Sequence, residues 1–136
     1  MTTEMLIEEA LKARDKSYCP YSGYAVGAAI LCKDGSVYTG CNIENAAFGP
    51  TICAERCAIH KAVSEGVTAF EKIAICGGKK GEAPVDYAYP CGVCRQVMQE
   101  FTDADAFVVA VGTSPSDYKE FKLKELLPFG FGPDNL

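Results

Sequence analysis

Two short segments carry side chains whose types and spacing suit metal chemistry. Residues 53–56 read C-A-E-R, and residues 90–94 read P-C-G-V-C. A C-x-x-C pair alone is a weak indication, because redox motifs and structural zinc sites share it. A third cysteine, followed two residues later by a glutamate, makes the combination more specific. Because soft thiolate ligands favour zinc, we predict that Cys53, Cys91 and Cys94 bind one zinc ion.

Three protein ligands leave one position of a tetrahedral zinc ion open. An open position is typical of catalytic zinc, which binds water there and lowers the pKa of that water toward about 7. Glu55 falls in the same helical turn as Cys53, so its carboxylate is placed to move a proton of the bound water. Three thiolates give the complex a net negative charge, and Arg56 is placed to offset it by hydrogen bonding to the sulfurs.

Both segments fall where the hydrophobic pattern predicts the start of a helix. Residues 53–64 and 91–101 read as helices, and Gly66 follows the first of them as a stop signal. The N-terminus of a helix presents free amide hydrogens and the positive end of the helix dipole, which stabilise thiolates. We therefore expect two adjacent helix N-termini to hold the three sulfurs in one tight pocket.

The remaining elements must bring these two helices together. Gly27, Ala28 and Ala29 indicate that another element packs closely on the strand that contains them. The order of the elements, α-β-β-α-β-α-β, predicts a mixed sheet covered by helices. Besides the two helices above, the pattern predicts a helix at 4–16, a hairpin of strands 26–32 and 37–42, buried strands at 72–76 and 106–111, and a short amphipathic piece at 121–127.

Length and composition limit the possible classes of protein. At 136 residues, we expect one domain spanning 1–136. The net charge of −5 argues against a nucleic-acid binder, and the longest uncharged stretch, 17–32, is too short and broken to cross a membrane. The N-terminus lacks the features of a signal peptide, so we expect a cytoplasmic protein whose eight cysteines are reduced, most of them as core thiols. His60, the only histidine, is expected to be a surface or packing residue.

Several further segments match one family in their order and spacing. They are P-Y-S at 20–22, V-G-A-A at 26–29, N-I-E-N at 42–45, A-V-S-E-G at 62–66, P-C-G-V-C-R-Q at 90–96 and L-L-P at 126–128. Together with C-A-E-R at 53–56, they resemble the small homotetrameric, zinc-dependent cytidine deaminases over nearly the whole chain. The resemblance implies an α/β fold with three α/β/α layers around a five-stranded mixed sheet.

The resemblance also implies a reaction. Free cytidine and 2'-deoxycytidine would be hydrolysed to uridine and 2'-deoxyuridine plus ammonia by a zinc-bound hydroxide, as a step of pyrimidine salvage. Cys53, Cys91 and Cys94 would hold one Zn²⁺ per subunit. Glu55 would carry protons from the bound water to the pyrimidine ring and the leaving ammonia. The subunits of a homotetramer would share their active sites.

The same resemblance assigns four contacts with the nucleoside. Asn42 and Glu44 match residues that bind the ribose hydroxyls in the family. The backbone of Ala54 and Cys91 would contact the base. These residues would therefore hold the two ends of the substrate.

Three aromatic residues complete the implied substrate site. Tyr24 stands where the family usually has a phenylalanine beside the ring, and Phe48 falls where other members often have tyrosine. Phe131, in the segment that follows Pro128, matches an aromatic residue that family members place in a neighbouring subunit's active site. An exposed apolar segment at 129–131 independently indicates a surface for a partner subunit.

Other functions fit parts of the same pattern. A blasticidin-type antibiotic deaminase shares the fold, but the N-I-E-N segment and Phe131 favour cytidine. A polynucleotide deaminase is disfavoured by the net negative charge. A non-catalytic zinc-binding module requires a fourth protein ligand, for which Cys57, on the same helix face as Cys53, is the candidate. Such a closed site would leave Glu55 without a function.

Overall fold

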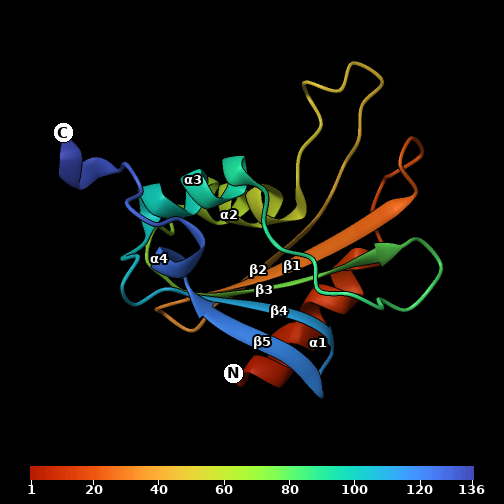
Figure 1. Ribbon diagram of the computed structural model, residues 1–136, viewed down its shortest axis with the longest axis horizontal. Coiled ribbons are helices and arrows are strands. Elements are labelled where there is room, and N and C mark those ends of the chain that lie inside the picture. Colours follow the sequence, from red (N-terminus) through yellow and green to blue (C-terminus); the bar gives the residue numbers. More distant parts are fainter.

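Five strands form one sheet, which carries helices on both faces (Figure 1). The computed structural model describes residues 1–136. Its elements are α1 (Thr3–Arg14), β1 (Tyr24–Cys32), β2 (Val37–Cys41), α2 (Ala54–Ser64), β3 (Phe70–Lys79), α3 (Gly92–Phe101), β4 (Val108–Ser114), β5 (Asp117–Lys122), α4 (Leu123–Leu126) and the 3-10 helix η1 (Pro133–Asn135). The strand order is β2-β1-β3-β4-β5. β3 and β4 are parallel and the other neighbouring pairs are antiparallel, so the sheet is mixed.

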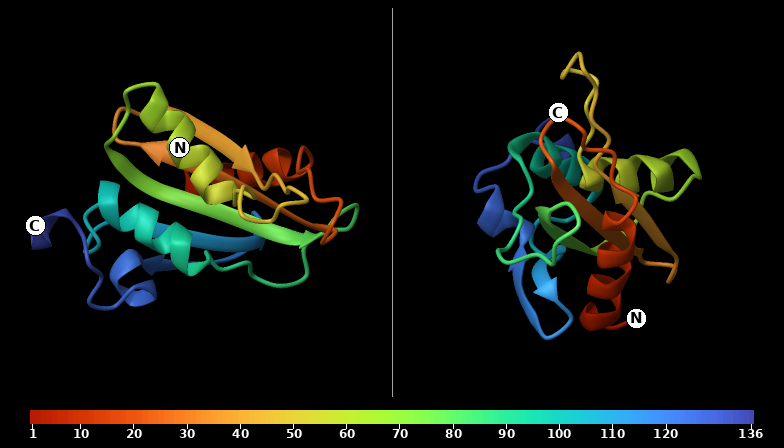
Figure 2. Two further views of the ribbon diagram at one scale, coloured as in Figure 1. Left: turned by 90° about the horizontal axis from the view of Figure 1, so that it is seen from above. Right: turned by 90° about the vertical axis from the view of Figure 1, so that its right-hand side faces the viewer.

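The two faces of the sheet carry separate hydrophobic cores. On one face, Leu6, Ile7 and Ala10 of α1 are fully buried with Ala74 of β3. On the other face, α2 and α3 pack over a larger core that includes Ile75. Figure 2 shows α1 on one side of the sheet and α2 and α3 on the opposite side. This three-layer α/β/α arrangement around a five-stranded mixed sheet confirms the predicted fold class.

The order of the elements brings the N-termini of α2 and α3 to one end of the sheet. α3 follows β3 and leads to the parallel strand β4, so its N-terminus lies near the carboxyl end of β3. The connection from α2 to β3 is short, so α2 runs back along the sheet and starts at the same end. The two predicted zinc-binding segments therefore meet at this end of the sheet.

Small residues allow the helices to approach the sheet closely. A Cβ atom on Gly27 of β1 would lie 2.0 Å from the carbonyl oxygen of Ala10 in α1. On β2, a Cβ atom on Gly40 would lie 2.6 Å from the backbone nitrogen of Ala58 in α2. The prediction that another element packs closely on the strand containing Gly27 is confirmed, and that element is α1.

The C-terminal region differs from the sequence-based prediction. The amphipathic piece expected at 121–127 is two elements, because Phe121 and Lys122 end β5 and only 123–126 form the helix α4. The hydrophobic pattern does not predict β5, because β5 is an edge strand and most of its residues are exposed. β3 also extends beyond the predicted 72–76, since pairing with β1 adds residues at both ends, from Phe70 at its start to Lys79 at its end.

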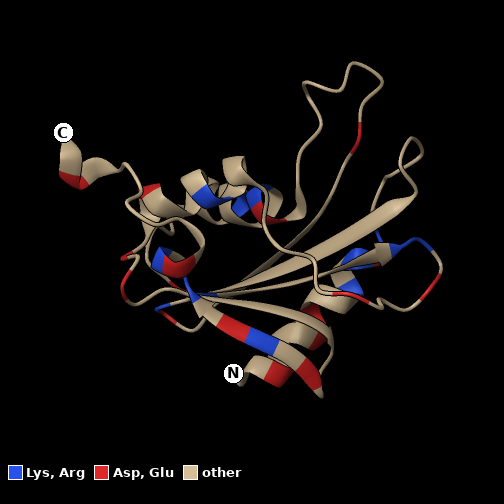
Figure 3. Ribbon diagram, in the orientation of Figure 1, with Lys and Arg blue, Asp and Glu red and all other residues tan.

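Acidic and basic residues are interspersed over the elements of the fold. Figure 3 shows both signs alternating along β5 and both on the loops at the edges of the sheet. No helix is long and apolar enough to cross a bilayer. His60 is exposed on α2, as predicted.

Candidate metal centre and active site

The three predicted zinc ligands converge at the two helix N-termini. Cys53 is the N-cap residue of α2, Cys91 is the N-cap residue of α3, and Cys94 lies in the first turn of α3. Neither N-cap thiol caps its own helix, so both remain directed to other partners. The three sulfur atoms lie within 4.8 Å of one another. Cys57 does not belong to this group.

The spacing of the sulfur atoms fits a zinc ion. The Sγ atoms of Cys53 and Cys91 are 3.7 Å apart, and those of Cys91 and Cys94 are 3.5 Å apart. A tetrahedral ion with Zn–S bonds of about 2.3 Å spaces its sulfur ligands roughly 3.8 Å apart. Cys94 is fully buried whereas Cys91 is exposed, so the group is open to solvent on one side. The donor set therefore suits a zinc ion with three protein ligands.

Arg56 supports the thiolate form of Cys53. Its Nη2 atom donates a hydrogen bond to the Cys53 sulfur at 3.4 Å, while its buried Nε atom has no partner. Hydrogen bonding from Cys94, followed by that from Arg56, lowers the pKa of Cys53 to about 5. This direct contact supports the predicted role of Arg56, which is to offset the negative charge of the sulfurs.

We expect Arg56→Gln to reduce activity more than stability. Loss of a group that hydrogen bonds a metal ligand typically costs about 10–100-fold in activity or metal affinity. Because Arg56 is partly exposed and faces the sulfurs, the melting temperature is expected to change little. Steady-state rates, zinc content and melting curves measured together check this, with Arg56→Lys as the charge-preserving control. If the rate, zinc content and melting temperature are all unchanged, Arg56 has no role in offsetting charge.

Glu55 is a buried carboxyl group beside the three sulfurs. Its relative exposure is 4%, and it is the second residue of α2. Burial is the main cause that raises the pKa of Glu55 to about 7. A carboxyl group with a pKa near neutrality can both accept and donate a proton at that pH. The position therefore suits the proton-carrying role predicted for this residue.

A cavity of about 490 Å³ opens onto the three-cysteine group. Val26 and Ile75 contribute apolar side chains to it from neighbouring strands. Cys53, Glu55 and Cys91 line the part of the cavity at the three predicted zinc ligands, which we call its metal end. Its lining also contains Ser22, Tyr24, Asn42, Glu44, Thr51, Ile52, Ala54, Tyr87, Ala88 and Tyr89. Neither lysine nor arginine lines the cavity, so an uncharged polar ligand suits it better than an anion.

Asn42 and Glu44 both line the cavity, and both form hydrogen bonds with the backbone of neighbouring residues. The Asn42 side chain accepts a hydrogen bond from the Val26 amide at 2.9 Å and donates one to the Tyr24 carbonyl at 2.8 Å. Glu44 accepts hydrogen bonds from two backbone amides of the turn at Tyr21 and Ser22 and from the Ser22 hydroxyl. The Ser22 hydroxyl is the main cause that lowers the pKa of Glu44.

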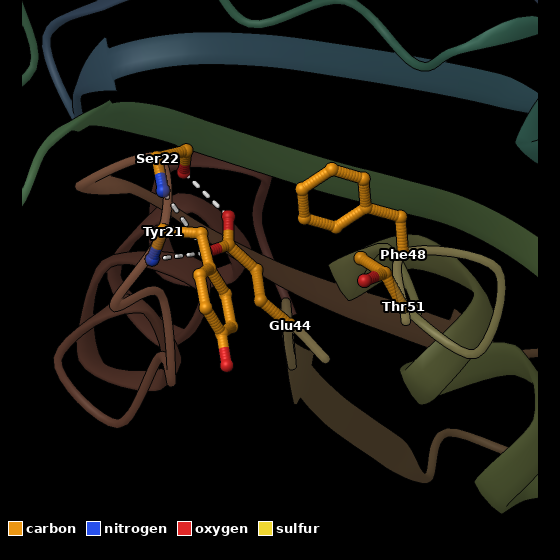
Figure 4. Close-up of a pocket in the computed structure, with 5 residues that line it drawn as sticks. All are labelled: Tyr21, Ser22, Glu44, Phe48 and Thr51. Atoms are coloured by element: carbon orange, nitrogen blue, oxygen red, sulfur yellow. Dashed lines mark hydrogen bonds between the residues drawn. The ribbon is translucent and has the colours of Figure 1, made fainter. Parts of the chain in front are cut away.

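Phe48 lines an adjoining hollow rather than the metal end of the cavity. This hollow of about 310 Å³ is lined by Tyr21, Ser22, Glu44, Phe48 and Thr51. Figure 4 shows the Glu44 carboxylate held by the turn at 21–22, with the Phe48 ring on the other side of the hollow. Phe48 is 72% exposed, and its ring meets the Tyr21 ring edge-on, with 6.1 Å between the centroids.

Phe131 does not line the cavity of its own chain. It is 57% exposed on the C-terminal tail, where its carbonyl accepts a hydrogen bond from Gln96 of α3 at 2.8 Å. The neighbouring Phe129 is fully exposed and has a positive φ of 56°. Of the predicted substrate-binding residues, the structure brings Tyr24, Asn42, Glu44 and Ala54 into the lining of the cavity at the three-cysteine group, and Phe48 and Phe131 are not part of that lining.

Several lining residues were not singled out by the sequence analysis, among them three consecutive ones. Tyr87, Ala88 and Tyr89 belong to the segment between β3 and α3, to which the sequence analysis assigned no helix or strand. They immediately precede Pro90 and the Cys91 ligand, and that adjacency is the signal that would have identified them. The Tyr87 hydroxyl donates a hydrogen bond to Asp117 of β5, so this wall of the cavity is tied to the edge of the sheet.

Comparisons with known proteins agree with this geometry. Residues 1–111 match the family described as the cytidine and deoxycytidylate deaminase zinc-binding region. The chain is 47% identical to the cytidine deaminase of Halalkalibacterium halodurans, over all of this chain and 98% of that protein. It is 45% identical to the cytidine deaminase of Sporosarcina psychrophila, over all of this chain and 96% of that protein.

Solved structures show the same arrangement of elements. The crystal structure of cytidine deaminase from Burkholderia pseudomallei matches with a TM-score of 0.87 and 40% identity, covering 96% of this chain and all of that one. The crystal structure of cytidine deaminase from Mycobacterium tuberculosis matches with a TM-score of 0.80 and 36% identity, covering 97% and 98% of the two chains. The similarity therefore extends over the whole fold as well as the metal-binding segments.

Proposed function

Since this chain belongs to the cytidine and deoxycytidylate deaminase family, we propose that it hydrolyses free cytidine and 2'-deoxycytidine to uridine and 2'-deoxyuridine, releasing ammonia. It is a zinc-dependent deaminase, with one zinc ion per subunit. The observation that carries the proposal is the meeting of three thiol groups and a buried carboxyl group at the end of one cavity. That cavity has the size expected of a small-molecule site, about 300–1,000 Å³.

The residues at the metal end divide the proposed chemistry between them. Cys53, Cys91 and Cys94 would hold the zinc ion, which when bound supplies the Lewis acidity that activates a water molecule. Glu55 would take one proton from the attacking water and deliver it to a ring nitrogen of the base. It would then move the second proton of that water, from the new hydroxyl group on the ring carbon, to the amino group, which leaves as ammonia. Arg56 donates to the Cys53 sulfur and keeps that ligand in its thiolate form.

The opposite end of the cavity suits a ribose. Hydrogen bonds from the backbone already orient Asn42 and Glu44. Their side chains would therefore bind the ribose hydroxyls with little further loss of side-chain entropy. Tyr24 and Val26, whose backbone is held by Asn42, flank the space between ribose and base. The backbone of Ala54 and Cys91 is proposed to contact the base itself.

The lining of the cavity favours a free nucleoside over a nucleotide or a polynucleotide. A phosphate group would need cationic partners, and the cavity contains two glutamates and neither lysine nor arginine. The overall charge of −5 disfavours nucleic acid in the same way. We accordingly propose a role for the single domain at 1–136 in pyrimidine salvage in the cytoplasm.

The assay that tests this proposal supplies several substrates to the zinc-loaded protein and identifies the products by chromatography. We expect cytidine and 2'-deoxycytidine to be converted, and cytidine monophosphate and single-stranded DNA to remain unchanged. Conversion of blasticidin S but of neither nucleoside would replace the proposal by the antibiotic deaminase. Full zinc content without conversion of any substrate would indicate a non-catalytic zinc-binding module.

Phe131 and Phe48 support a further part of the proposal, a homotetramer whose subunits complete one another's active sites. Both aromatic rings are largely exposed, and neither reaches the metal end of the cavity in its own chain. An exposed aromatic side chain gains most of its binding energy only when a partner covers it. We therefore propose that Phe131 reaches the cavity of a neighbouring subunit.

We expect Phe131→Ala to raise the KM for cytidine by about two- to tenfold, because an aromatic contact with the neighbour's substrate is lost. The turnover number is expected to change less than the KM. Leu136→Ala, at an exposed position of the same tail outside 129–131, is the control and is expected to leave the KM unchanged. Sedimentation under assay conditions completes the test, and an active monomer would refute the shared site.

A further inference from the structure

Arg14 is a buried cation that the proposed chemistry does not use. It is the last residue of α1 and is only 7% exposed. Its guanidinium donates hydrogen bonds to the carbonyl oxygens of Ala25 at 3.0 Å, Lys79 at 2.7 Å and Glu82 at 2.8 Å. No carboxylate pairs with it. Because desolvating a charge is costly, the three carbonyl contacts are what keeps the guanidinium in this position.

The three acceptors do not line the cavity at the three-cysteine group, but they lie in or next to segments that do. Ala25 lies in β1 between Tyr24 and Val26, which both line the cavity. Lys79 ends β3, and Glu82 lies in the segment 80–90 that leads to the lining residues 87–89. Arg14 therefore connects the start of β1 with the start of this segment. Figure 3 shows the basic end of α1 beside the basic end of β3.

Two glycines provide the space that this connection requires. Gly27 lets the C-terminal end of α1 approach β1, since a Cβ atom there would lie 2.5 Å from the backbone nitrogen of Arg14. A Cβ atom on Gly78 would lie 3.3 Å from Nη2 of Arg14 and 3.0 Å from Cα of Pro84. The guanidinium of Arg14 and Pro84 of the segment 80–90 thus both pack against Gly78 of β3, which has no side chain.

Other contacts hold the segment 80–90 at different points. Near its start, the Lys80 amide donates to the Gly23 carbonyl at 2.8 Å, and the Lys80 side chain donates to the Ser17 carbonyl at 2.6 Å. At its far end, Tyr87 donates to Asp117. Between these points, Glu82 is held by Arg14. Glu82 also donates its amide to the Lys79 carbonyl at 3.1 Å and pairs with the Lys79 side chain at 3.4 Å. The guanidinium adds a tie from this early part of the segment to α1.

We propose that Arg14 is a positioning residue for the substrate cavity. From the face of the sheet opposite the metal, it holds the segment 80–90 against β1, so that Tyr87, Ala88 and Tyr89 form a wall in the correct place for a nucleoside. Arg14 touches neither the substrate nor the zinc ligands. This inference rests on the proposed deamination of cytidine for its substrate, but its structural part is independent of that reaction.

The test compares Arg14→Met and Arg14→Lys with Lys12→Met, which removes an exposed cation from the same helix. We expect Arg14→Met to raise the KM for cytidine about tenfold, because charge-assisted hydrogen bonds that position the wall are lost. The turnover number is expected to change less than about twofold, and zinc content is expected to stay complete. Arg14→Lys, which keeps the charge without the planar fork, is expected to fall between the wild type and Arg14→Met. Lys12→Met should match the wild type.

Limited trypsin digestion provides a second readout that needs no activity. Lys79 and Lys80 are exposed at the start of the segment, so its detachment should speed cleavage after them in Arg14→Met but not in Lys12→Met. If the wild type does not convert cytidine, the proposed function fails while this comparison still tests the attachment. Equal cleavage rates in the wild type and Arg14→Met would overturn the inference.

A purely structural role for Arg14 would give a different pattern. If Arg14→Met lowers the melting temperature but leaves both the KM and the trypsin pattern unchanged, Arg14 does not position the wall. Should Arg14→Met fail to fold, Gly78→Ala tests the same contact from the other side, because its Cβ atom displaces Pro84 and the guanidinium. A raised KM in Gly78→Ala with complete zinc supports the inference, and an unchanged KM overturns it.

Discussion

Glu55→Gln is expected to abolish nearly all deaminase activity while leaving the zinc site and the fold intact. Glutamine has nearly the shape of glutamate but cannot accept a proton, so the variant retains packing and loses proton transfer. A positioned general acid–base contributes about 10²–10⁴-fold to a rate, and here the same group serves more than one proton transfer. The carboxyl group is also buried, and the neutral amide therefore avoids its cost of desolvation.

The measurement for this variant combines turnover, zinc content and nucleoside binding. Glu65→Gln is the matched control, since Glu65 follows the last residue of the same helix and is exposed. We expect Glu55→Gln to bind zinc and cytidine at wild-type levels while its turnover falls by the factor given above. Near-native turnover in Glu55→Gln would remove this residue from the mechanism.

Cys91→Ala is expected to lose zinc and, with it, all measurable activity. Its sulfur lies 3.7 Å from that of Cys53 and 3.5 Å from that of Cys94, so it is a full member of the three-sulfur group. Removal of the Cys91 sulfur leaves two thiol groups, one fewer than the three protein ligands of a catalytic zinc site. Because Cys91 is exposed, the substitution creates no cavity in the core. The fold is therefore expected to persist in a zinc-free form.

Cys57→Ala is the control that separates an open site from a closed one. Cys57 lies on α2 like Cys53 but does not belong to the converging group. Metal analysis by mass spectrometry is expected to find one zinc ion per chain in Cys57→Ala and none in Cys91→Ala. Loss of zinc from Cys57→Ala would instead identify a fourth protein ligand and a closed, structural site.

The metal centre could be predicted from the sequence because its geometry is mostly local. Cys53 and Cys91 each stand at a helix N-terminus, a position that stop signals and hydrophobic spacing indicate without any knowledge of tertiary contacts. Glu55 lies two residues after Cys53 in the first turn of the same helix, and the structure places it in the same cavity lining as Cys53 and Cys91. The fold class followed from the alternation of strands and helices together with the family resemblance.

The walls of the cavity depend on contacts that local patterns do not contain. The hydrogen bond from Tyr87 to Asp117 and those from Arg14 to Lys79 and Glu82 join residues that are distant in sequence. β5 was not predicted, because an edge strand with charged residues on its exposed face has little hydrophobic signal. Such features emerge only when the sheet is assembled.

The most direct test of the central claim is the ultraviolet absorbance of cytidine on mixing with the protein in three states. These are the zinc-loaded protein, the protein stripped by a chelator, and the stripped protein after zinc is returned. Deamination converts the cytosine chromophore to uracil, so we expect absorbance in the cytidine band to fall with the first and third states and to stay constant with the second. A protein confirmed to hold zinc that leaves the absorbance of both cytidine and 2'-deoxycytidine unchanged would contradict the assignment.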